Sequence, residues 1–241
     1  MSGIIRPGDP RFNGVPSKNP GPQPPADPRP VVAVLVPSTD MVHADFMVAL
    51  ISMLWHSNNF ARTLLLNFKG SAISFSRNVL AGRALEAPVA VDAVLFLDSD
   101  LVFPPDTLAR LLRSGRSIVG ATYARRKEPF EALGRLIPRG RDLSQGGIHE
   151  AEALPAGCLL IATSVFRQLK KPWFFETYDE ARDPWFVSED YGFCEKARAA
   201  GMTLWCDLTL STQIGHIGQH AVQFPPLASA PPAMAEAAVD G

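Results

Sequence analysis

Two acidic residues, Asp98 and Asp100, directly follow the apolar run Val94-Leu95-Phe96-Leu97. If the chain stays extended there, both side chains point to the same side of the backbone. Two carboxylates this close repel each other unless a cation or a proton neutralises them. Mg²⁺ or Mn²⁺ suits such a pair, because these ions are held by one or two carboxylates together with the phosphates of a substrate. Asp98-Ser99-Asp100 therefore predicts a site for a divalent metal and a phosphate. A polar turn that caps the helix after Pro104 is the structural alternative.

A late histidine, His216, has Gly215 before it and Gly218 close behind it. A neutral imidazole can join carboxylates around Mn²⁺, and the glycines let backbone and ring approach a bound ion closely. His216 is thus a candidate metal ligand, with a purely structural role as the alternative. His220 is a competing candidate that we rank lower.

Glu189 and Asp190 follow Val187-Ser188 and begin a predicted helix. Acidic residues in a first turn are favoured by the helix dipole, which is a structural reason for both. The functional interpretation is a general base, because a carboxylate near a reacting hydroxyl can take its proton. These residues alone do not distinguish Glu189 from Asp190.

Arg77-Asn78 lies at the start of another predicted helix. A guanidinium there could clamp a diphosphate together with the helix N-terminus, although a surface arginine is an equally good interpretation. Arg125, Arg126 and Lys127 could add positive charge in the same way, or form a solvated basic loop.

The elements that must position these residues are short apolar runs that alternate with helical patterns. Strands are predicted at Val31–Val36, Thr63–Phe68, Ala93–Leu97, Ser117–Gly120, Ala156–Ala162 and Thr203–Cys206. Helices are predicted at His43–His56, Asn78–Leu85, Thr107–Arg113 and Glu189–Ala199, the second capped by Ser76 and the last by Ser188. The polar segment Arg125–Glu150 is expected to be a long loop.

This alternation predicts an α/β fold with a mixed, mostly parallel sheet and helices on both faces. In such sheets ligands bind beyond the carboxyl ends of the strands. Pro37–Asp40 and Asp98–Asp100 both fall at such ends. We expect one domain at residues 31–222, between a flexible Pro/Gly-rich arm at 1–30 and a flexible Pro/Ala-rich tail at 223–241.

Bulk composition narrows the class of protein. The formal net charge is −1, which argues against a nucleic-acid binder. The three cysteines form no CxxC pair, which argues against a zinc site or a disulfide framework. We expect neither a transmembrane segment, because no apolar run approaches the required length of about 20 residues, nor a signal peptide, because the Pro/Gly-rich start lacks an apolar region. We therefore expect a cytoplasmic protein.

The order of these motifs resembles the GT-A fold glycosyltransferases, in particular the family-2-like group, which share a Rossmann-like sheet. The resemblance extends over about Val31 to Gly218. It is carried by Val34-Leu35-Val36-Pro37-Ser38, Ser76-Arg77-Asn78, Phe96-Leu97-Asp98-Ser99-Asp100, Gly157-Cys158-Leu159-Leu160-Ile161, Ser188-Glu189-Asp190-Tyr191-Gly192-Phe193-Cys194 and His216-Ile217-Gly218.

The resemblance implies transfer of a sugar from a UDP- or GDP-sugar donor held through Mn²⁺ or Mg²⁺. Asp100 would coordinate the ion, Asp98 would contact the ion or the ribose, and His216 would be a third protein ligand. The residues expected to contact the donor are Pro37, Ser38, Asp40, Arg77, Asn78, Asp98 and Ser99.

The acceptor implied by the resemblance is a hydroxyl of an unidentified glycan, protein or small molecule. Glu189 or Asp190 would face it, with Asp190 our choice of base if the reaction inverts the anomeric centre. Asn67 and Lys69 stand where related enzymes often carry an acidic residue for the nucleobase, so the preferred base stays open. A processive polysaccharide synthase is disfavoured, because the sequence lacks its QxxRW-like signature and membrane helices.

Two other functions compete with this interpretation. A haloacid-dehalogenase-like phosphatase also places Asp-x-Asp after an apolar strand and uses Mg²⁺. That motif normally lies on the first strand, whereas two strand–helix units precede Asp98 here. A non-catalytic nucleotide-sugar-binding protein is the second competitor, and metal-dependent hydrolysis or transfer would separate it from an enzyme.

Overall fold

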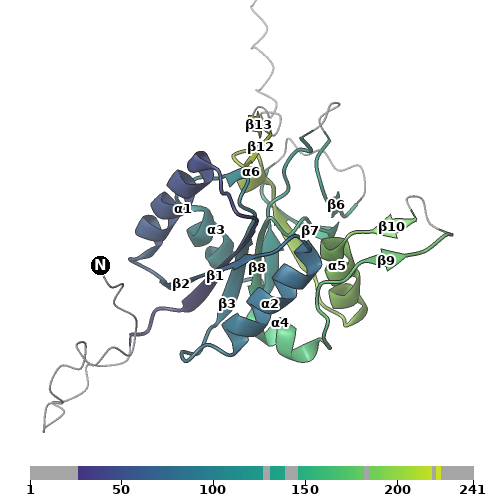
Figure 1. The fold of residues 1–241 in the computed structure, drawn as a ribbon, viewed down its shortest axis with the longest axis horizontal. Coiled ribbons are helices and arrows are strands. Elements are labelled where there is room, and N and C mark those ends of the chain that lie inside the picture. The colour runs from purple at the N-terminus through teal and green to yellow at the C-terminus, as the bar shows by residue number, and fades with distance from the viewer. Residues whose placement is uncertain (1–26, 127–130, 139–145, 182–184, 219–220, 224–241) are drawn as a thin grey trace, which may run out of the picture.

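The computed structural model describes residues 27–126, 131–138, 146–181, 185–218 and 221–223. Most of the predicted arm and tail lie outside the described residues, as do Lys127 and His220. The main sheet has the strand order β2-β1-β3-β8-β5-β11-β7-β6 (Figure 1). Its strands are β1 (Val31–Ser38), β2 (Arg62–Lys69), β3 (Ala93–Leu97), β5 (Ile118–Gly120), β6 (Arg135–Leu136), β7 (Ile148–Ala153), β8 (Cys158–Ala162) and β11 (Leu204–Asp207).

Six of the eight strands run in one direction, and β8 and β7 run against them. The helices are α1 (Ala44–Ser57), α2 (Ile73–Leu85), α3 (Thr107–Arg113), α4 (Thr163–Gln168), α5 (Glu189–Ala199) and α6 (Leu208–Ser211). The predicted α/β class, with a mixed sheet and helices on both faces, is confirmed. Three of the seven neighbouring strand pairs in the described sheet are parallel and four are antiparallel.

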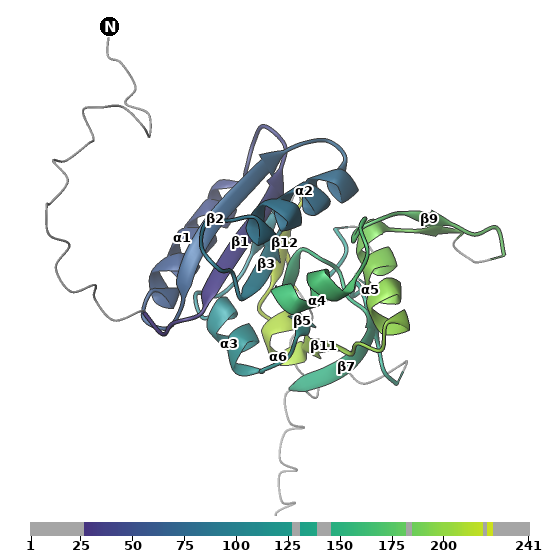
Figure 2. The ribbon, with the colours of Figure 1, turned by 90° about the horizontal axis from the view of Figure 1, so that it is seen from below.

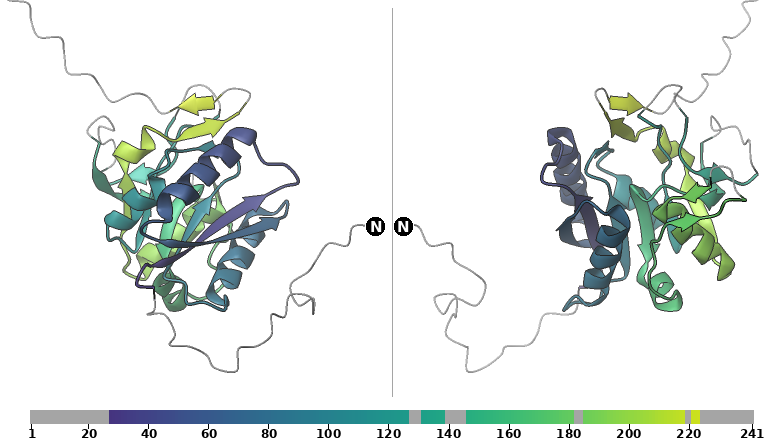
Figure 3. Two further views of the ribbon diagram at one scale, coloured as in Figure 1. Left: turned by 90° about the vertical axis from the view of Figure 1, so that its left-hand side faces the viewer. Right: turned by 45° about the vertical axis from the view of Figure 1, so that its right-hand side comes forward.

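Helices cover both faces of the sheet, which is why the central strands are apolar throughout. All residues of β1 and β3 are buried, and their side chains alternate between two cores. One core packs β-strand residues such as Leu35 and Phe96 against α2, α4 and α5. The other packs residues such as Val34 and Leu95 against α1 and α3. Figure 3 shows helices on both faces of the sheet.

The predicted helix α3 is confirmed with its bounds, and α5 begins directly after Ser188 and ends before Gly201, whose φ is +81°. The predicted start of α2 is wrong, because the helix begins at Ile73 and Ser76 lies inside it. The Ser76 hydroxyl donates to the carbonyl of Ala72, one turn earlier, instead of capping the helix.

The prediction of a long loop at Arg125–Glu150 is also wrong in its described part, which contains β6 and the first residues of β7. In β7 the buried positions Ala151 and Ala153 alternate with polar ones, and the strand pairs antiparallel with β11. Alanine gives little apolar signal, so the alternation was hidden by His149, Glu150 and Glu152.

A second sheet forms beside the carboxyl end of β3. It has the order β13-β12-β4 and consists of β4 (Leu101–Val102), β12 (Gly215–Ile217) and β13 (Ala221–Gln223). A third, two-stranded sheet of β9 (Thr177–Tyr178) and β10 (Phe186–Val187) extends away from the body of the protein just before α5 (Figure 2). Within the described ranges, every helix is too short or too polar to span a bilayer.

Candidate functional site

Asp98 occupies the first position after β3, at the carboxyl edge of the sheet. Its amide donates to the carbonyl of Gly157 at 2.9 Å, which ties the end of β3 to the start of β8. The amide of Leu101 donates to the carbonyl of Asp98 at 3.3 Å, so the chain turns at once into β4. The predicted position of the Asp98–Asp100 motif at a strand end is therefore confirmed.

A buried arginine, Arg77 of α2, links Asp98 to the start of α5. Its Nη2 donates to both carboxylate oxygens of Asp98 at 2.9 and 3.2 Å, and its Nε donates to Oε1 of Glu189 at 3.1 Å. Its Nη1 donates to the carbonyl of Ala156 at 3.2 Å. Only 3% of the Arg77 side chain is exposed, so the guanidinium is held by protein groups on all sides.

The three charges in this cluster support one another. Burial opposes the charge of Arg77, but the carboxylates of Asp98 and Glu189 outweigh it and raise the pKa of Arg77. Burial raises the pKa of Asp98 and of Glu189, while the Arg77 guanidinium opposes both shifts. Arg77 is thus the cation that keeps two buried carboxylates compatible.

Gly157 leaves room for Tyr123 beside Asp98. A Cβ atom at Gly157 would lie 2.2 Å from the Tyr123 hydroxyl and 2.7 Å from Oδ2 of Asp98. Burial and the charge of Asp98 raise the pKa of Tyr123, so its hydroxyl stays protonated in this position. Glycine is the residue that this close packing allows.

Asp100 and His216 are 116 positions apart in the sequence and face each other in the structure. Residue Leu101 pairs with His216 in the β4–β12 ladder, and the amide of Ile217 donates to the carbonyl of Asp100 at 2.7 Å. Nε2 of His216 lies 3.7 Å from Oδ2 of Asp100. Gly215 permits this ladder, because a Cβ atom there would lie 2.5 Å from Cγ2 of Val102.

The orientation of His216 leaves Nε2 toward Asp100. Its Nδ1 lies 2.9 Å from the carbonyl of Ala124, which can only accept, so Nδ1 carries a proton and Nε2 is the nitrogen that faces Asp100. Arg126 also pairs with Oδ2 of Asp100 at 3.1 Å. Burial opposes the charge of Asp100, but His216 and Arg126 outweigh it and hold the pKa of Asp100 below its ordinary value.

These residues fit a divalent metal only in part. In the described ranges, no three His, Cys, Asp or Glu side chains are arranged to hold an ion. Asp100 and His216 face each other, and the contact of Nδ1 with Ala124 orients the His216 ring, but Oδ2 of Asp100 is also paired with Arg126. Asp98, the third predicted ligand, directs both oxygens at Arg77. Mg²⁺ is typically held by one or two carboxylates and completes its shell with water and phosphate, and of the three predicted ligands Asp100 alone offers a carboxylate that is not directed at Arg77.

A cavity of about 550 Å³ opens beside the acidic motif. Pro37 and Ser38 from the end of β1 line it, as do Asp98, Ser99 and Asp100 from the turn after β3. Sequence reasoning missed the remaining walls, which come from Met41, Val42, His43, Gly70, Ser71 and Ile73. The loops after β1 and β2 carry all of them except Ile73, which is the first residue of α2. The rule that ligands bind beyond strand ends would have included the second loop.

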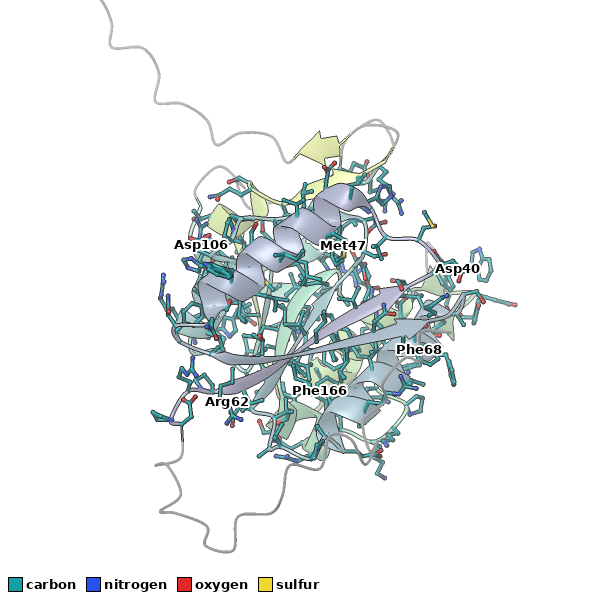
Figure 4. The ribbon with its side chains drawn as sticks, turned by 60° about the vertical axis from the view of Figure 1, so that its left-hand side comes forward. Asp40, Met47, Arg62, Phe68, Asp106 and Phe166 are labelled. Carbon is teal, nitrogen blue, oxygen red and sulfur yellow. The ribbon has the colours of Figure 1, made fainter. Side chains whose placement is uncertain are left out.

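Asp40 and Asn78, which were predicted to contact the donor, do not line this cavity. Asp40 is exposed at the periphery (Figure 4), where it pairs with Lys69 at 2.5 Å. Asn78 is directed inward: its Nδ2 donates to the carbonyl of Phe174 at 2.6 Å and its Oδ1 accepts from the amide of Trp173 at 2.8 Å. Arg77, as described above, is also fully engaged by protein groups. A direct contact between the donor and any of these three stays a prediction without geometric support.

Glu189 and Asp190 have different surroundings although they are adjacent. Glu189 is buried against Arg77, whereas Asp190 lines a second cavity of about 810 Å³ together with Gly134, Phe186 and Tyr191. Oδ1 of Asp190 accepts from the Ser188 hydroxyl and from the amide of Tyr191. Both of these contacts are made by Oδ1.

Known proteins share this architecture without close sequence similarity. Neither a protein-family model nor a curated protein matches the sequence. The crystal structure of A197 from STIV matches 83% of this chain and 97% of its own, with a TM-score of 0.55 and 15% identity. The chain shares its fold with A197.

Two solved glycosyltransferases also resemble this chain. One is the catalytic domain of Drosophila beta1,4galactosyltransferase 7 in complex with xylobiose, which covers 78% of this chain and 71% of its own, with a TM-score of 0.49 and 16% identity. The other is a glycosyltransferase involved in the glycosylation of the major capsid of PBCV-1, with coverages of 60% and 70%, a TM-score of 0.34 and 11% identity. Both scores lie below 0.5 and establish no activity for this chain.

Proposed function

We propose that the protein is a metal-dependent glycosyltransferase that moves a sugar from a UDP- or GDP-sugar to an acceptor hydroxyl. The observation that carries the proposal is the placement of Asp98-Ser99-Asp100 at the end of β3, on the wall of the 550 Å³ cavity, with His216 beside Asp100. A nucleotide and its phosphates need this kind of concave site, formed by loops at the carboxyl edge of an α/β sheet.

In this proposal Asp100 and His216 hold Mn²⁺ or Mg²⁺. When bound, the ion would neutralise the charge that develops on the departing nucleoside diphosphate. Pro37, Ser38 and Ser99 line the cavity, and in this proposal Pro37 and Ser38 would contact the nucleoside and Ser99 the phosphates. Asp98 stays paired with Arg77 and orients the turn that carries Asp100.

Asp190 is the general base of the proposal, and Glu189 is a positioning residue. Asp190 faces the second cavity, where an acceptor hydroxyl could approach Oδ2 and give up its proton as the glycosidic bond forms. The bond from Ser188 to Oδ1 fixes the carboxylate, and Glu189 anchors the start of α5 through Arg77. The two adjacent acids therefore have separate tasks.

A donor screen tests the proposal. UDP- and GDP-sugars are incubated with the protein and Mn²⁺ or Mg²⁺, with and without a mixture of simple saccharide acceptors, and release of nucleoside diphosphate is measured. We expect release from at least one donor, and chelation of the metal should abolish it. A lack of binding and release for every donor, with metal present, would sink the proposal.

A further inference from the structure

Three aromatic side chains gather on the exposed sheet of β9 and β10. Tyr178, Trp185 and Phe186 are 64%, 58% and 38% exposed. Their ring centroids lie 5.5 Å apart for Tyr178–Trp185, 5.4 Å for Tyr178–Phe186 and 6.4 Å for Trp185–Phe186. We call these three residues the aromatic cluster.

The backbone holds the aromatic cluster in place. Tyr178 and Phe186 are direct partners in the antiparallel ladder, and the amide of Asp179 donates to the carbonyl of Trp185 at 2.8 Å. Tyr178 and Trp185 nevertheless stay more than half exposed. Contiguous exposed apolar groups of this kind commonly mark a binding site.

The aromatic cluster is continuous with the second cavity. Phe186 and Val187 line the cavity together with Asp190, and Ser188 connects them along the chain. The same cavity is lined by Arg125, Arg135, Glu152 and Glu195. A ligand that bridges cluster and cavity would therefore meet flat apolar rings at one end and charged hydrogen-bonding groups at the other.

We propose that the aromatic cluster binds a sugar ring of a saccharide acceptor, so that a hydroxyl of that saccharide reaches Asp190. The inference rests on the proposed function and names the acceptor class. A pyranose ring offers an apolar C–H face to an aromatic side chain and hydroxyl groups at its rim, which matches the two kinds of surface.

Other occupants fit less well. Residues 176–185 contain four acidic residues and one basic residue, which disfavours an anionic lipid surface. The aromatic cluster offers on the order of 300 Å² of surface. A stable protein partner needs about 800 Å² on each side.

Binding of simple saccharides to the full-length protein tests the inference without donor or metal. The chain has four tryptophans, so ¹⁵N-labelled indole groups give a small set of resonances to follow. Cellobiose, xylobiose, diacetylchitobiose, lactose and maltose are titrated, with sorbitol as a polyol that lacks a ring face. We expect a saturable shift of the Trp185 indole with at least one disaccharide and none with sorbitol.

Variants of the aromatic cluster test whether the sugar ring stacks on these side chains or whether any exposed tryptophan has the same effect. Trp185→Ala and Tyr178→Ala should each weaken disaccharide binding by about tenfold, and Trp185→Phe should restore most of it. Trp55→Ala is the matched control, because Trp55 is 84% exposed on α1 and lies outside the second cavity. The Trp55→Ala variant should bind disaccharides as tightly as the wild type.

Three results would overturn the inference: no disaccharide shifts the Trp185 resonance, the Ala variants bind as tightly as the wild type, or phosphatidylcholine vesicles cause the shift and saccharides do not. Each of these would leave the donor site standing, because the titration contains no nucleotide-sugar. Conversely, failure of the donor screen with intact saccharide binding would reject the glycosyltransferase and retain a saccharide site.

Discussion

Replacing Arg77 by methionine would remove the cation that joins three elements of the candidate site. The substitution keeps a long apolar stem inside the protein but leaves Asp98 and Glu189 without the guanidinium that now donates three hydrogen bonds to them. Removing one partner of a buried ion pair typically costs about 3–5 kcal/mol, because the remaining charge stays buried. For a domain of this size, we expect the melting temperature to fall by about 6–20 °C.

The loss should depend on pH in a defined direction. Burial raises the pKa values of Asp98 and Glu189 above their ordinary values of 3.8 and 4.5, and Arg77 opposes that rise. A carboxyl whose pKa is raised by folding stabilises the protein fully below its unfolded pKa and loses that contribution as the pH rises through the folded pKa. Without Arg77 both folded pKa values rise further. The difference between wild type and Arg77→Met should therefore be smallest near pH 4–5 and grow toward pH 8.

The assay is urea unfolding followed by circular dichroism at several pH values. Arg83→Met is the matched control, since Arg83 lies on the exposed side of the same helix. It should change the free energy of unfolding by less than about 1 kcal/mol. The double variant Arg77→Met/Glu189→Gln should recover part of the lost free energy of unfolding, because it removes one of the two buried carboxylates that no longer have a cationic partner. Equal destabilisation by Arg77→Met and Arg83→Met, or a loss independent of pH, would refute the reasoning.

Three further outcomes follow from the site. Asp190→Asn should leave donor binding intact and slow transfer by about 10²- to 10⁴-fold, and unchanged turnover would reject Asp190 as the base. Gly157→Ala should lower the free energy of unfolding by about 1–3 kcal/mol through the clash with the Tyr123 hydroxyl. Adding Tyr123→Phe to the same chain should recover part of this loss. Chemical denaturation of both variants measures the two effects, and no recovery would contradict the contact. Arg126→Ala should tighten Mn²⁺ binding by up to about fivefold, because the substitution removes a half-exposed cation that competes for Asp100. Electron paramagnetic resonance of free Mn²⁺ measures the affinity. Weaker binding would contradict this prediction and would mean that Arg126 assists the ion.

The predictable parts of this fold are those with a strong local signal. β1 and β3 are buried on both faces, so their sequences are apolar apart from Ser38 at the end of β1. The strand β7 was missed because its buried residues are alanines. The short strands β4 and β12 could not be predicted, because two or three residues carry too little periodicity.

The candidate site also has a part that local sequence patterns predict and a part that they do not. The position of Asp98 and Asp100 at a strand end follows from the run of residues before them. The pairing of Arg77 with Glu189 joins residues 112 positions apart and depends on how α2 meets α5, which no local pattern encodes. The different tasks proposed for Glu189 and Asp190 likewise follow from which of the two side chains faces Arg77.

The central claim is that Asp100, beside His216, holds a metal-bound nucleotide-sugar. Calorimetric titration of the responding donor, with and without Mn²⁺, into wild type and Asp100→Ala tests it most directly. Asp106→Ala is the control, because Asp106 pairs with Arg110 outside the donor cavity. We predict tight binding only with Mn²⁺, retained by Asp106→Ala and lost by Asp100→Ala. Donor binding that needs no metal and survives in Asp100→Ala would contradict the account.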